Sequence, residues 1–589
     1  MQEKFLVLGI NHGGHDTSAA LMLDGKLVAA CEQERYSRDK HSRKFPTEAA
    51  KDCLKQAGFT IGNVREIAFA FDPVYHIQEA YLKPALTDSW QINRIIGDAE
   101  RIKDNFLVEN VIREQTEFRG PIRYFNHHLC HLASAYFPSG FNEALLTSYD
   151  GIGEIESGMF AAGRDGRIEV LHKKNIFPDS LGLLYSAITF FLGWRHHCDE
   201  GIVMGLATYG DPDHQIPGDG RTYADVFEEI AQKRAMYSYH VNRDWIAFHR
   251  ERDTWVSGQF HSVFGKKRDE QGEITQHHMD IAAALQRRLE EIIVSQLHAV
   301  RRKTGLKHLC LSGGVALNCS LNGRIEKSRI FDEIFVQPAS GDAGTAVGAC
   351  YLSSADALSE IKPKAQHNFY LGSGFADQEV EDALKKHSLS AQKPKNIYRV
   401  TAEKLADGEI IGWYQGRAEF GPRALGNRSI LTRPYPAEMK DYLNKRVKFR
   451  EAFRPFAPAV LNDYLGEYFD IQQESPHMLI ACQATKLAGE RIPATVHVDN
   501  SCRVQSVKEV NNQRFFRLLS AFFEITGCPV LLNTSFNVRG EPIVNTPTDA
   551  FNCFMGTELD YLVIGDCILD KLKQDQNFKK NYAKEFELD

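Results

Sequence analysis

Three common features are absent from this sequence of 589 residues, and each absence removes a class of protein. The 12 cysteines are scattered and include no Cys-x-x-Cys pair, which argues against a disulfide framework or a zinc knuckle. No segment approaches the ~20 consecutive apolar residues that a membrane span needs, and the N-terminal apolar run is too short for a signal peptide. We therefore expect a cytoplasmic protein with reduced cysteines.

An excess of positive charge is also lacking. The chain has 70 Lys and Arg against 77 Asp and Glu, for a net charge of −7, so it has no overall attraction to nucleic acid or to an anionic membrane. Hydrophobic residues at 43% and charged residues at 25% are typical of a folded globular protein. Because 589 residues exceed what one core usually supports, we expect two or more domains. Any anion site must be local.

The sequence does contain a repeated pattern of glycine-rich turns. Residues 4–27 (KFLVLGINHGGHDTSAALMLDGKL) read as strand, glycine loop and strand, and residues 143–168 (EALLTSYDGIGEIESGMFAAGRDGRI) repeat the pattern. In each, the chain turns at a cluster of Gly, Asp and Ser or Thr, where exposed backbone amides can face a phosphate.

Two more glycine turns follow a helix predicted over residues 279–305 by its apolar spacing. HLCLSGGVALNCSLNGRI (308–325) and EIFVQPASGDAGTAVGACYL (333–352) each read as strand, glycine turn and helix start. Four such turns favour the duplicated actin-like ATPase architecture, with a nucleotide between two halves. Ordinary α/β turns without a ligand are the alternative.

The polar stretch ADALSEIKPKAQ (355–366) predicts a domain boundary, because it has no apolar periodicity. Beyond it, EIIGWYQ, PFAPAVL, PVLLNTS and DYLVIG read as strands, with helices near 377–387, 437–447, 510–526 and 546–555. This pattern predicts a second α/β domain.

A basic stretch lies within that second domain. Residues 417–454 contain ten Lys or Arg and four Asp or Glu, a local reversal of the overall charge. Such a reversal indicates an anion pocket, since guanidinium groups match phosphate oxygens. A solvated charged surface is the common alternative, and nucleic-acid binding is disfavoured because aromatics are not interleaved with the cations. HVDNSCRVQSV (497–507) and PVLLNTSFNVRGEPIV (529–544) put polar residues past apolar strands, for a small polar ligand or for structural hydrogen bonds.

The segment NHHLCHLASAY (126–136) contains a His-x-x-x-His pair, His127 and His131. On a helix, residues four apart lie about 5 to 6 Å apart on one face and can share a metal ion. With 22 histidines in the chain, the spacing also arises by chance roughly once, so by itself it decides nothing.

The motifs in combination resemble the NodU/CmcH family of O-carbamoyltransferases over essentially the whole chain. The resemblance rests, in order, on NHGGHDTSAAL, HHLCH, YDGIGE, GGVALN, SGDAG, GRAEFGPRALGNRSI, FREAFRPFAPAVL and LLNTSFNVRGEPIV. It implies a mixed α/β chain: an actin-like, TsaD-like ATPase domain over 1–358 and a YrdC-like α/β domain over 367–589. It further implies transfer of the carbamoyl group of carbamoyl phosphate, through a carbamoyl-adenylate made with ATP, to a hydroxyl of a small natural product.

The resemblance also implies site residues in the first domain. The expected metal ligands are His127, His131, Asp150 and Asp342, a set that suits Fe(II), Mn(II) or Zn(II). Iron is the expected ion, with magnesium accompanying the nucleotide. His15 is the expected catalytic residue and Lys40 a weaker candidate, with loop hydrogen bonding and solvent exposure as their respective alternatives. His128 is expected to be structural.

The nucleotide and carbamoyl phosphate sites follow from the same matches. Nucleotide contacts are expected from Gly151, Gly153, Gly313, Gly314, Asn318, Gly341 and Met478, although Met478 equally suits a core position. Carbamoyl phosphate contacts are expected from Arg423, Lys448, Arg454, Arg503, Asn533 and Ser535. Arg417 and Arg450 are expected to support these residues without contacting the ligand. One departure is that Ile202 and Val203 stand where family members often carry a lysine before MGLA, which leaves backbone contacts only.

Two other functions compete with the carbamoylation of a small molecule. A TsaD-like tRNA threonylcarbamoyl transferase would share the metal and nucleotide logic, but it would need a broad basic face for tRNA, and no nucleic-acid partner is expected. A nucleotide-sensing scaffold of the actin type is the non-enzymatic alternative. The acceptor itself is not predicted; its specificity is expected from 75–120 or 210–275, where Trp90, Trp245, Trp255 and several tyrosines either line a pocket or pack. A homodimer is compatible with the sequence.

Overall fold

Two five-stranded sheets with the same topology form the N-terminal half of the computed structural model, which describes residues 4–86, 90–251, 253–358, 361–575, 582 and 586. The first sheet has the order β3 (Lys26–Glu32), β2 (Ser18–Leu23), β1 (Leu6–Asn11), β4 (Glu66–Phe69), β5 (Ile122–Tyr124). The second has the order β8 (Arg167–Ile176), β7 (Glu156–Arg164), β6 (Glu143–Tyr149), β11 (His308–Ser312), β12 (Glu333–Val336).

Strand directions also repeat between the two sheets. In each, the first three strands are an antiparallel meander, and two parallel strands follow on the other side of the first. The duplicated, actin-like α/β architecture expected from the glycine hairpins is therefore confirmed. β1 is buried along its whole length because both of its faces are covered.

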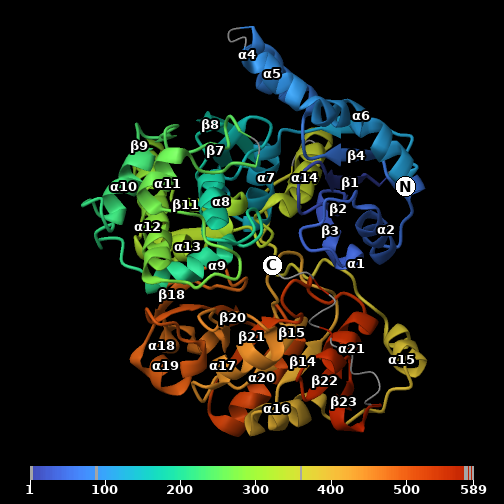
Figure 1. Cartoon of the computed structure of the whole chain (residues 1–589). Helices are drawn as coiled ribbons and strands as arrows, with labels where there is room; N and C mark the ends of the chain where they lie inside the picture. Colours follow the sequence, from blue (N-terminus) through green and yellow to red (C-terminus); the bar gives the residue numbers. More distant parts are fainter. Residues whose placement is uncertain are drawn as a thin grey trace.

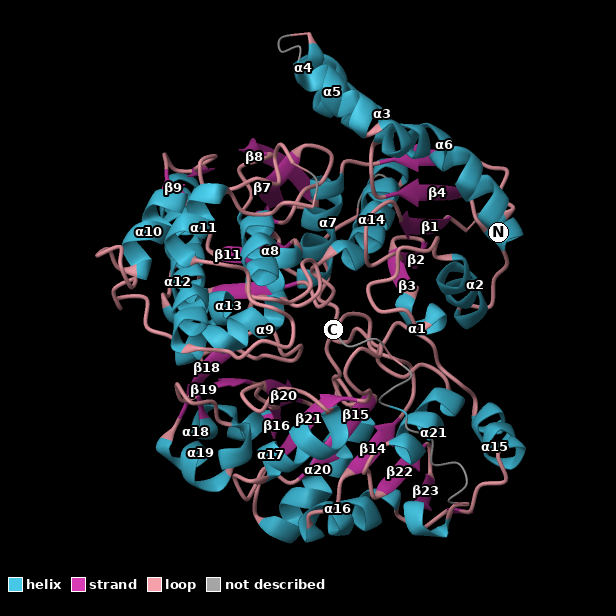
Figure 2. Cartoon of the chain, viewed as in Figure 1, coloured by secondary structure: helices cyan, strands magenta, loops and turns pink. Residues whose placement is uncertain are grey.

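Two helices pack against each other between the sheets, α7 (His127–Ser139) and α14 (Thr345–Ala357) (Figure 1). A Cβ at Gly348 would lie 1.8 Å from the carbonyl oxygen of Cys130, so glycine is required for this close approach. The long helix predicted over 279–305 is α12 (Gln276–Thr304), which ends at Gly305 with a φ of 73°. It flanks the second sheet together with α8 (Leu181–Phe191) (Figure 2).

The C-terminal half is the second α/β unit that the sequence predicted. Its eight-stranded sheet has the order β13 (Ala391–Gln392), β23 (Cys567–Asp570), β22 (Tyr561–Ile564), β14 (Ile411–Tyr414), β15 (Arg428–Thr432), β21 (Val530–Ser535), β16 (Ala457–Leu461), β20 (Gln505–Val507). The predicted helices are α15 (Asp377–Lys386), α17 (Met439–Leu443), α20 (Gln513–Thr526) and α21 (Pro547–Gly556). α17 is shorter than predicted, because residues Asn444–Lys448 form a π-helical turn instead.

The segment that joins the halves is packed rather than free. The carbonyl oxygen of Leu371 accepts a hydrogen bond from the backbone of Ala30 at 3.0 Å, and Phe369 and Leu371 are buried with the core around α7 and α14. Elsewhere, α4 (Lys83–Ala85) and α5 (Trp90–Gly97) project away from the body of the N-terminal half (Figure 2). Among the described residues, no helix combines the length and apolar character of a membrane span.

Candidate functional site

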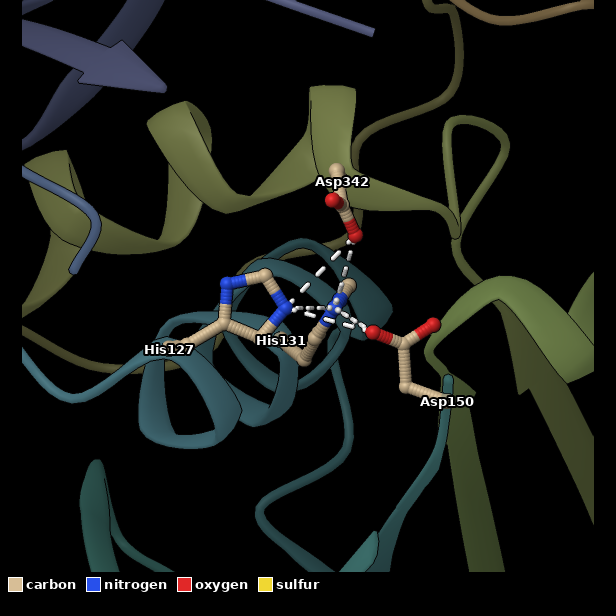
Figure 3. Close-up of side chains that lie close together, drawn as sticks. All are labelled: His127, His131, Asp150 and Asp342. Carbon is tan, nitrogen blue, oxygen red and sulfur yellow. Dashed lines mark hydrogen bonds and ion pairs between the residues drawn. The ribbon is translucent and has the colours of Figure 1, made fainter. Parts of the chain in front are cut away.

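The helix α7 carries the first two residues of a buried charged group. Its start is fixed by Asn126, whose side chain accepts a hydrogen bond from the backbone of Leu129, and by Glu154, which accepts one from the backbone of His127 at 2.9 Å. His127 and His131 then lie one turn apart, with their Nε2 atoms 3.0 Å from each other (Figure 3).

Two aspartates face these imidazoles: Asp150 directly after β6, and Asp342 in the 3₁₀ turn between β12 and α14. Asp150 Oδ2 lies 3.3 Å from His127 Nε2 and 3.6 Å from His131 Nε2, and Asp342 Oδ1 lies 3.5 and 3.8 Å from the same atoms (Figure 3). The backbone of Gly314 donates to Asp150 Oδ1 at 2.8 Å, which turns Oδ2 toward the imidazoles. The four side chains expected to bind a metal thus converge, and their ligand atoms lie within 4.8 Å of one another.

The chemistry of this group fits a divalent cation. Burial disfavours an imidazolium, yet Asp342 and Asp150 raise the pKa of His127 well above its usual value. Burial would raise the pKa of Asp150, but the two histidines hold it well below its usual value. Two imidazoles and two carboxylates form a donor set for Fe(II), Mn(II) or Zn(II), and the set does not distinguish among these ions.

His128 faces away from this group. Its ring nitrogens lie 2.7 Å from Ser148 Oγ and 2.8 Å from the carbonyl oxygen of Glu156. Burial and the neighbouring histidines lower its pKa to about 3, so it is neutral at physiological pH. These contacts give His128 the structural role that its place on the helix predicted.

His15, the candidate catalytic residue, belongs to a network that sequence reasoning missed. Asp16 Oδ2 lies 2.9 Å from His15 Nδ1, and Asp16 Oδ1 lies 2.8 Å from His41 Nδ1. Burial opposes a charge on His15, but Asp16 and Asp342 raise its pKa to about 10. His41 lies 25 residues from Asp16 and carries no spacing signal. Lys40 precedes it in the same loop and is half-buried.

The predicted nucleotide residues have varied local roles. Gly313, with a φ of 84°, packs on the backbone of Tyr149, and Gly153 lies against His127, where a Cβ would approach to 3.0 Å. Ser180 donates to the carbonyl oxygen of Gly151, and Gly341 precedes the 3₁₀ turn that carries Asp342.

Asn318 and Met478 are engaged within the fold. The Asn318 side chain caps α13 (Cys319–Lys327) and exchanges hydrogen bonds with Gln286 at 2.8 and 3.1 Å. Met478 is buried with Leu425 and Ala457, as its alternative core interpretation described. Nucleotide contacts from either residue stay a prediction.

A second charged group lies in the C-terminal half, and it consists of cations. We name it the cationic cluster: Arg423, Lys448, Arg450, Arg454 and Arg503. Lys448 Nζ donates to the carbonyl oxygen of Ser535 at 2.7 Å and to Asn537 Oδ1 at 2.7 Å. Arg450 donates to Asn444 and stacks over Phe456.

These cations repel one another. Burial and then Arg503 and Arg454 lower the pKa of Arg423 to about 9, and burial and Arg454 lower that of Arg450 well below its usual value. Within the described part of the chain, Nε of Arg423 and Nε of Arg503 are buried without a hydrogen-bond partner. A bound anion would supply the missing partners.

Two neutral residues expected at the same site adjoin it. Asn533 donates to the carbonyl oxygen of Ala424, next to Arg423, at 3.2 Å, and its own Oδ1 is buried without a partner among the described residues. Ser535 Oγ lies 3.2 Å from Lys448 Nζ. Arg417, in contrast, donates to the carbonyl oxygens of Val28 and Gly372 and so fastens the two halves together.

The halves meet beside the cationic cluster. Arg35 donates to the carbonyl oxygen of Gly421 at 2.7 Å, and Arg38 donates to Glu541 at 2.6 Å. Tyr209 donates to the carbonyl oxygen of Phe453 at 3.4 Å, next to Arg454. Ile202 and Val203, where the resemblance led us to expect a lysine, are buried in the core beside the second sheet.

Known proteins share both halves. The chain matches the Carbamoyltransferase N-terminus model over residues 6–351 and the Carbamoyltransferase C-terminus model over 402–571. It is 38% identical to nodulation protein NolNO of Sinorhizobium fredii over 95% of this chain and 79% of that protein. It is 36% identical to the 3'-hydroxymethylcephem-O-carbamoyltransferase of Streptomyces clavuligerus over 44% of this chain and 48% of that enzyme.

Among solved structures, component A of (R)-2-hydroxyglutaryl-CoA dehydratase from Acidaminococcus fermentans is similar at 13% identity and a TM-score of 0.32, covering 60% of this chain and 99% of that one. The two carbamoyltransferase models cover both halves of the chain, with the metal-ligand group inside the first and the cationic cluster inside the second. The protein therefore belongs to the carbamoyltransferase family and is an enzyme of that family.

Proposed function

We propose that the protein is an ATP-dependent O-carbamoyltransferase with two successive sites. At the cationic cluster, a water molecule hydrolyses carbamoyl phosphate to carbamate and phosphate. The carbamate oxygen then attacks the α-phosphorus of ATP, so that pyrophosphate leaves and carbamoyl-adenylate forms. At the candidate metal centre, the hydroxyl oxygen of a small acceptor attacks the carbamoyl carbon and its proton is released to solvent. The bond from that carbon to the adenylate oxygen breaks, and AMP leaves with its electron pair.

The observation that carries the proposal is the cationic cluster. Five Lys and Arg side chains lie together, and Arg423 and Arg503 pair with no described carboxylate. Arg454 does have a carboxylate nearby, since its Nη1 lies 3.7 Å from Glu451. Such an arrangement is costly unless an anion completes it. Carbamoyl phosphate, ATP and pyrophosphate are anions of the required kind, and guanidinium groups would stabilise charge that develops on their oxygens.

The metal centre supports the second step. His127, His131, Asp150 and Asp342 would hold the ion, which when bound would polarise an oxygen and orient the reacting groups. His15 and its partner Asp16 would hold the acceptor hydroxyl beside that centre. The Streptomyces clavuligerus relative is named for O-carbamoylation of a hydroxymethyl group, which favours a hydroxyl acceptor here as well.

The two steps can be tested separately. The full chain is incubated with ATP and carbamoyl phosphate, and carbamoyl-adenylate and pyrophosphate are measured without any acceptor. We expect Arg454→Ala to abolish adenylate formation. We expect His131→Ala to retain it but to lose transfer to any hydroxylated acceptor. Adenylate formation at the normal rate in Arg454→Ala would contradict the assignment of the first site, and no adenylate with the unaltered protein would contradict the proposed function.

A further inference from the structure

A group of rings lies beside His15 and has no role in the proposed chemistry so far. The ring of His15 stacks on that of His197, with centroids 5.4 Å apart and an angle of 28° between the planes. Trp255 follows, with its centroid 5.4 Å from His197 and 4.3 Å from His196. We call His196, His197 and Trp255 the ring wall.

The ring wall is close to the metal centre and is held in place. Asp342 acts electrostatically on both His15 and His197, which puts this metal-ligand candidate within range of both rings. His197 has a φ of 62°, which is unusual for a residue with a side chain, and its backbone amide donates to Glu200 at 2.6 Å. A histidine held in this conformation points to a constraint on where its ring lies.

Of the three tryptophans predicted as pocket residues, the Trp90 side chain lies outside the described part of the structure, and exposure distinguishes the other two. Trp245 is 1% exposed and packs with Phe260 in the core, so it is structural. Trp255 stays partly exposed, although its ring contacts those of Phe190, His196, His197 and Phe248. An indole of this kind binds the apolar face of a ring or sugar while its surroundings stay wet.

Three cations lie within electrostatic range of His196: Arg43, Lys267 and its sequence neighbour Arg195. Burial and then Arg43 and Arg195 lower the pKa of His196, with Lys267 acting in the same direction, and Arg43 also acts on His197. Asp253 opposes them at His196, which leaves an excess of positive charge.

These cations have few partners within the protein. Arg43 and Arg195 are exposed, and none of the three forms an ion pair with a carboxylate in the described part of the chain. Lys267 Nζ lies 3.4 Å from the centroid of the Phe190 ring. Their charge is therefore available to a ligand that lies against Trp255.

We propose that the ring wall is the acceptor subsite, and that the acceptor carries an anionic substituent next to a ring or other apolar face. The face lies on Trp255, the anion meets Arg43, Arg195 and Lys267, and the hydroxyl to be carbamoylated lies at His15. This inference rests on the proposed function and adds the chemical class of its acceptor. Carboxylate, sulfate and phosphate share the chemistry that guanidinium and ammonium groups recognise.

Matched acceptors test this inference. The full chain, with ATP, carbamoyl phosphate and ferrous ion, is given glucose, glucuronate or glucose 6-phosphate, and then inositol or inositol monophosphate, and carbamoylated products are measured by mass. We expect kcat/KM to be about tenfold higher for the anionic member of each pair, equivalent to about 1.4 kcal/mol. The preference should shrink as salt is raised, because the cations are partly exposed. A comparison of glucuronate with glucose 6-phosphate shows whether a carboxylate or a phosphate is preferred.

Variants distinguish the loss of positive charge at the ring wall from the loss of folding. The double variant Arg195→Ala/Lys267→Ala should lose the anion preference while forming carbamoyl-adenylate at the normal rate, and Lys266→Ala, an exposed neighbour, should keep the preference. Trp255→Phe should raise KM for every converted acceptor more than it changes kcat. Equal conversion of both members of each pair, or of neither while adenylate still forms, would overturn this inference alone. Absence of adenylate from the unaltered protein would instead overturn the proposed function.

Discussion

The candidate metal centre and the cationic cluster both gather ionisable side chains, but they differ in how charge is arranged. At the metal centre, imidazoles and carboxylates lie within 4 Å of one another and lower each other's electrostatic cost. In the cationic cluster, Arg423, Arg450 and Lys448 each lose basicity to burial and to another cation. The first arrangement balances its own charges, whereas the second consists of like charges that a bound anion would offset.

This difference has consequences for how each site responds to substitution. Removal of one histidine leaves the two carboxylates with a single imidazole to offset their charge, and it weakens the binding of any metal. Removal of one arginine relieves repulsion, so it should leave the fold intact while it removes anion binding. Stability and activity should therefore change together in the N-terminal half and separately in the C-terminal half.

The largest effect should follow from Arg503→Ala. Loss of one charged donor to a reacting anion typically costs about 10²- to 10³-fold in rate, and we expect that loss in carbamoyl-adenylate formation. The melting temperature should not fall, because the cluster becomes less repulsive. Arg517→Ala, which removes an exposed arginine from α20, is the matched control. If Arg503→Ala melted at a lower temperature but formed carbamoyl-adenylate normally, Arg503 would support the fold and would not bind the anion.

The next largest effect should follow from His131→Ala. Loss of a ligand should lower metal affinity by about 100-fold or more, beyond the 10- to 100-fold typical of residues that only support a ligand. Metal content after dialysis against a chelator measures this loss, with His298→Ala, an exposed histidine of α12, as control. Equal metal content in both variants would show that His131 is not a ligand.

The contact Arg38–Glu541, which joins the two halves, should have an intermediate effect. Glu541 is fully buried, and burial raises its pKa although Arg38 lowers it. Without Arg38, the pKa of Glu541 in the folded state rises further above its value in the unfolded state. The buried Glu541 side chain then destabilises the fold when it is ionised but not when it is protonated. Arg38→Ala should therefore cost about 2 kcal/mol at neutral pH, less than a fully buried pair because Tyr582 still donates to Glu541.

The pH dependence of that variant gives the sharper test. Its deficit in unfolding free energy should be small at acidic pH and should grow as the pH rises through the raised pKa of Glu541. Denaturant titrations at several pH values measure it, and Arg65→Ala, which removes an exposed arginine from the same half, should show no such trend. A deficit that is constant with pH would assign the loss to packing instead.

The smallest effect should follow from His41→Gln. Asp16 would keep its contact with His15 but lose the one with His41, so the orientation of His15 would be less well fixed. We expect about a tenfold lower kcat for carbamoyl transfer, with adenylate formation unchanged. Full transfer activity would mean that Asp16 positions His15 without help.

Much of the fold could be predicted from local patterns, and one strand shows where they fail. The apolar runs of β14, β16, β21 and β22 and the glycine hairpins of the first half were identified, because their periodicity is contained in a few residues. β15 lies within the basic stretch 417–454, where the sequence predicted an anion pocket and no strand. Arg428, at its start, is fully buried, stacks over Tyr414 and donates to the carbonyl oxygens of Gln415 and Ser373. A buried structural arginine and an anion-binding arginine look alike in a sequence.

By itself, the sequence determined the residues that a helix turn or a glycine loop places locally: the pair His127 and His131, and the turns that carry Asp150 and Asp342. Only the tertiary structure decided that His41 meets Asp16, that Trp255 meets His196, and that Arg417 fastens the two halves while Arg423 faces other cations. The reason is physical. Backbone periodicity and turn chemistry act over a few residues, whereas contacts between distant segments depend on how whole sheets and helices pack.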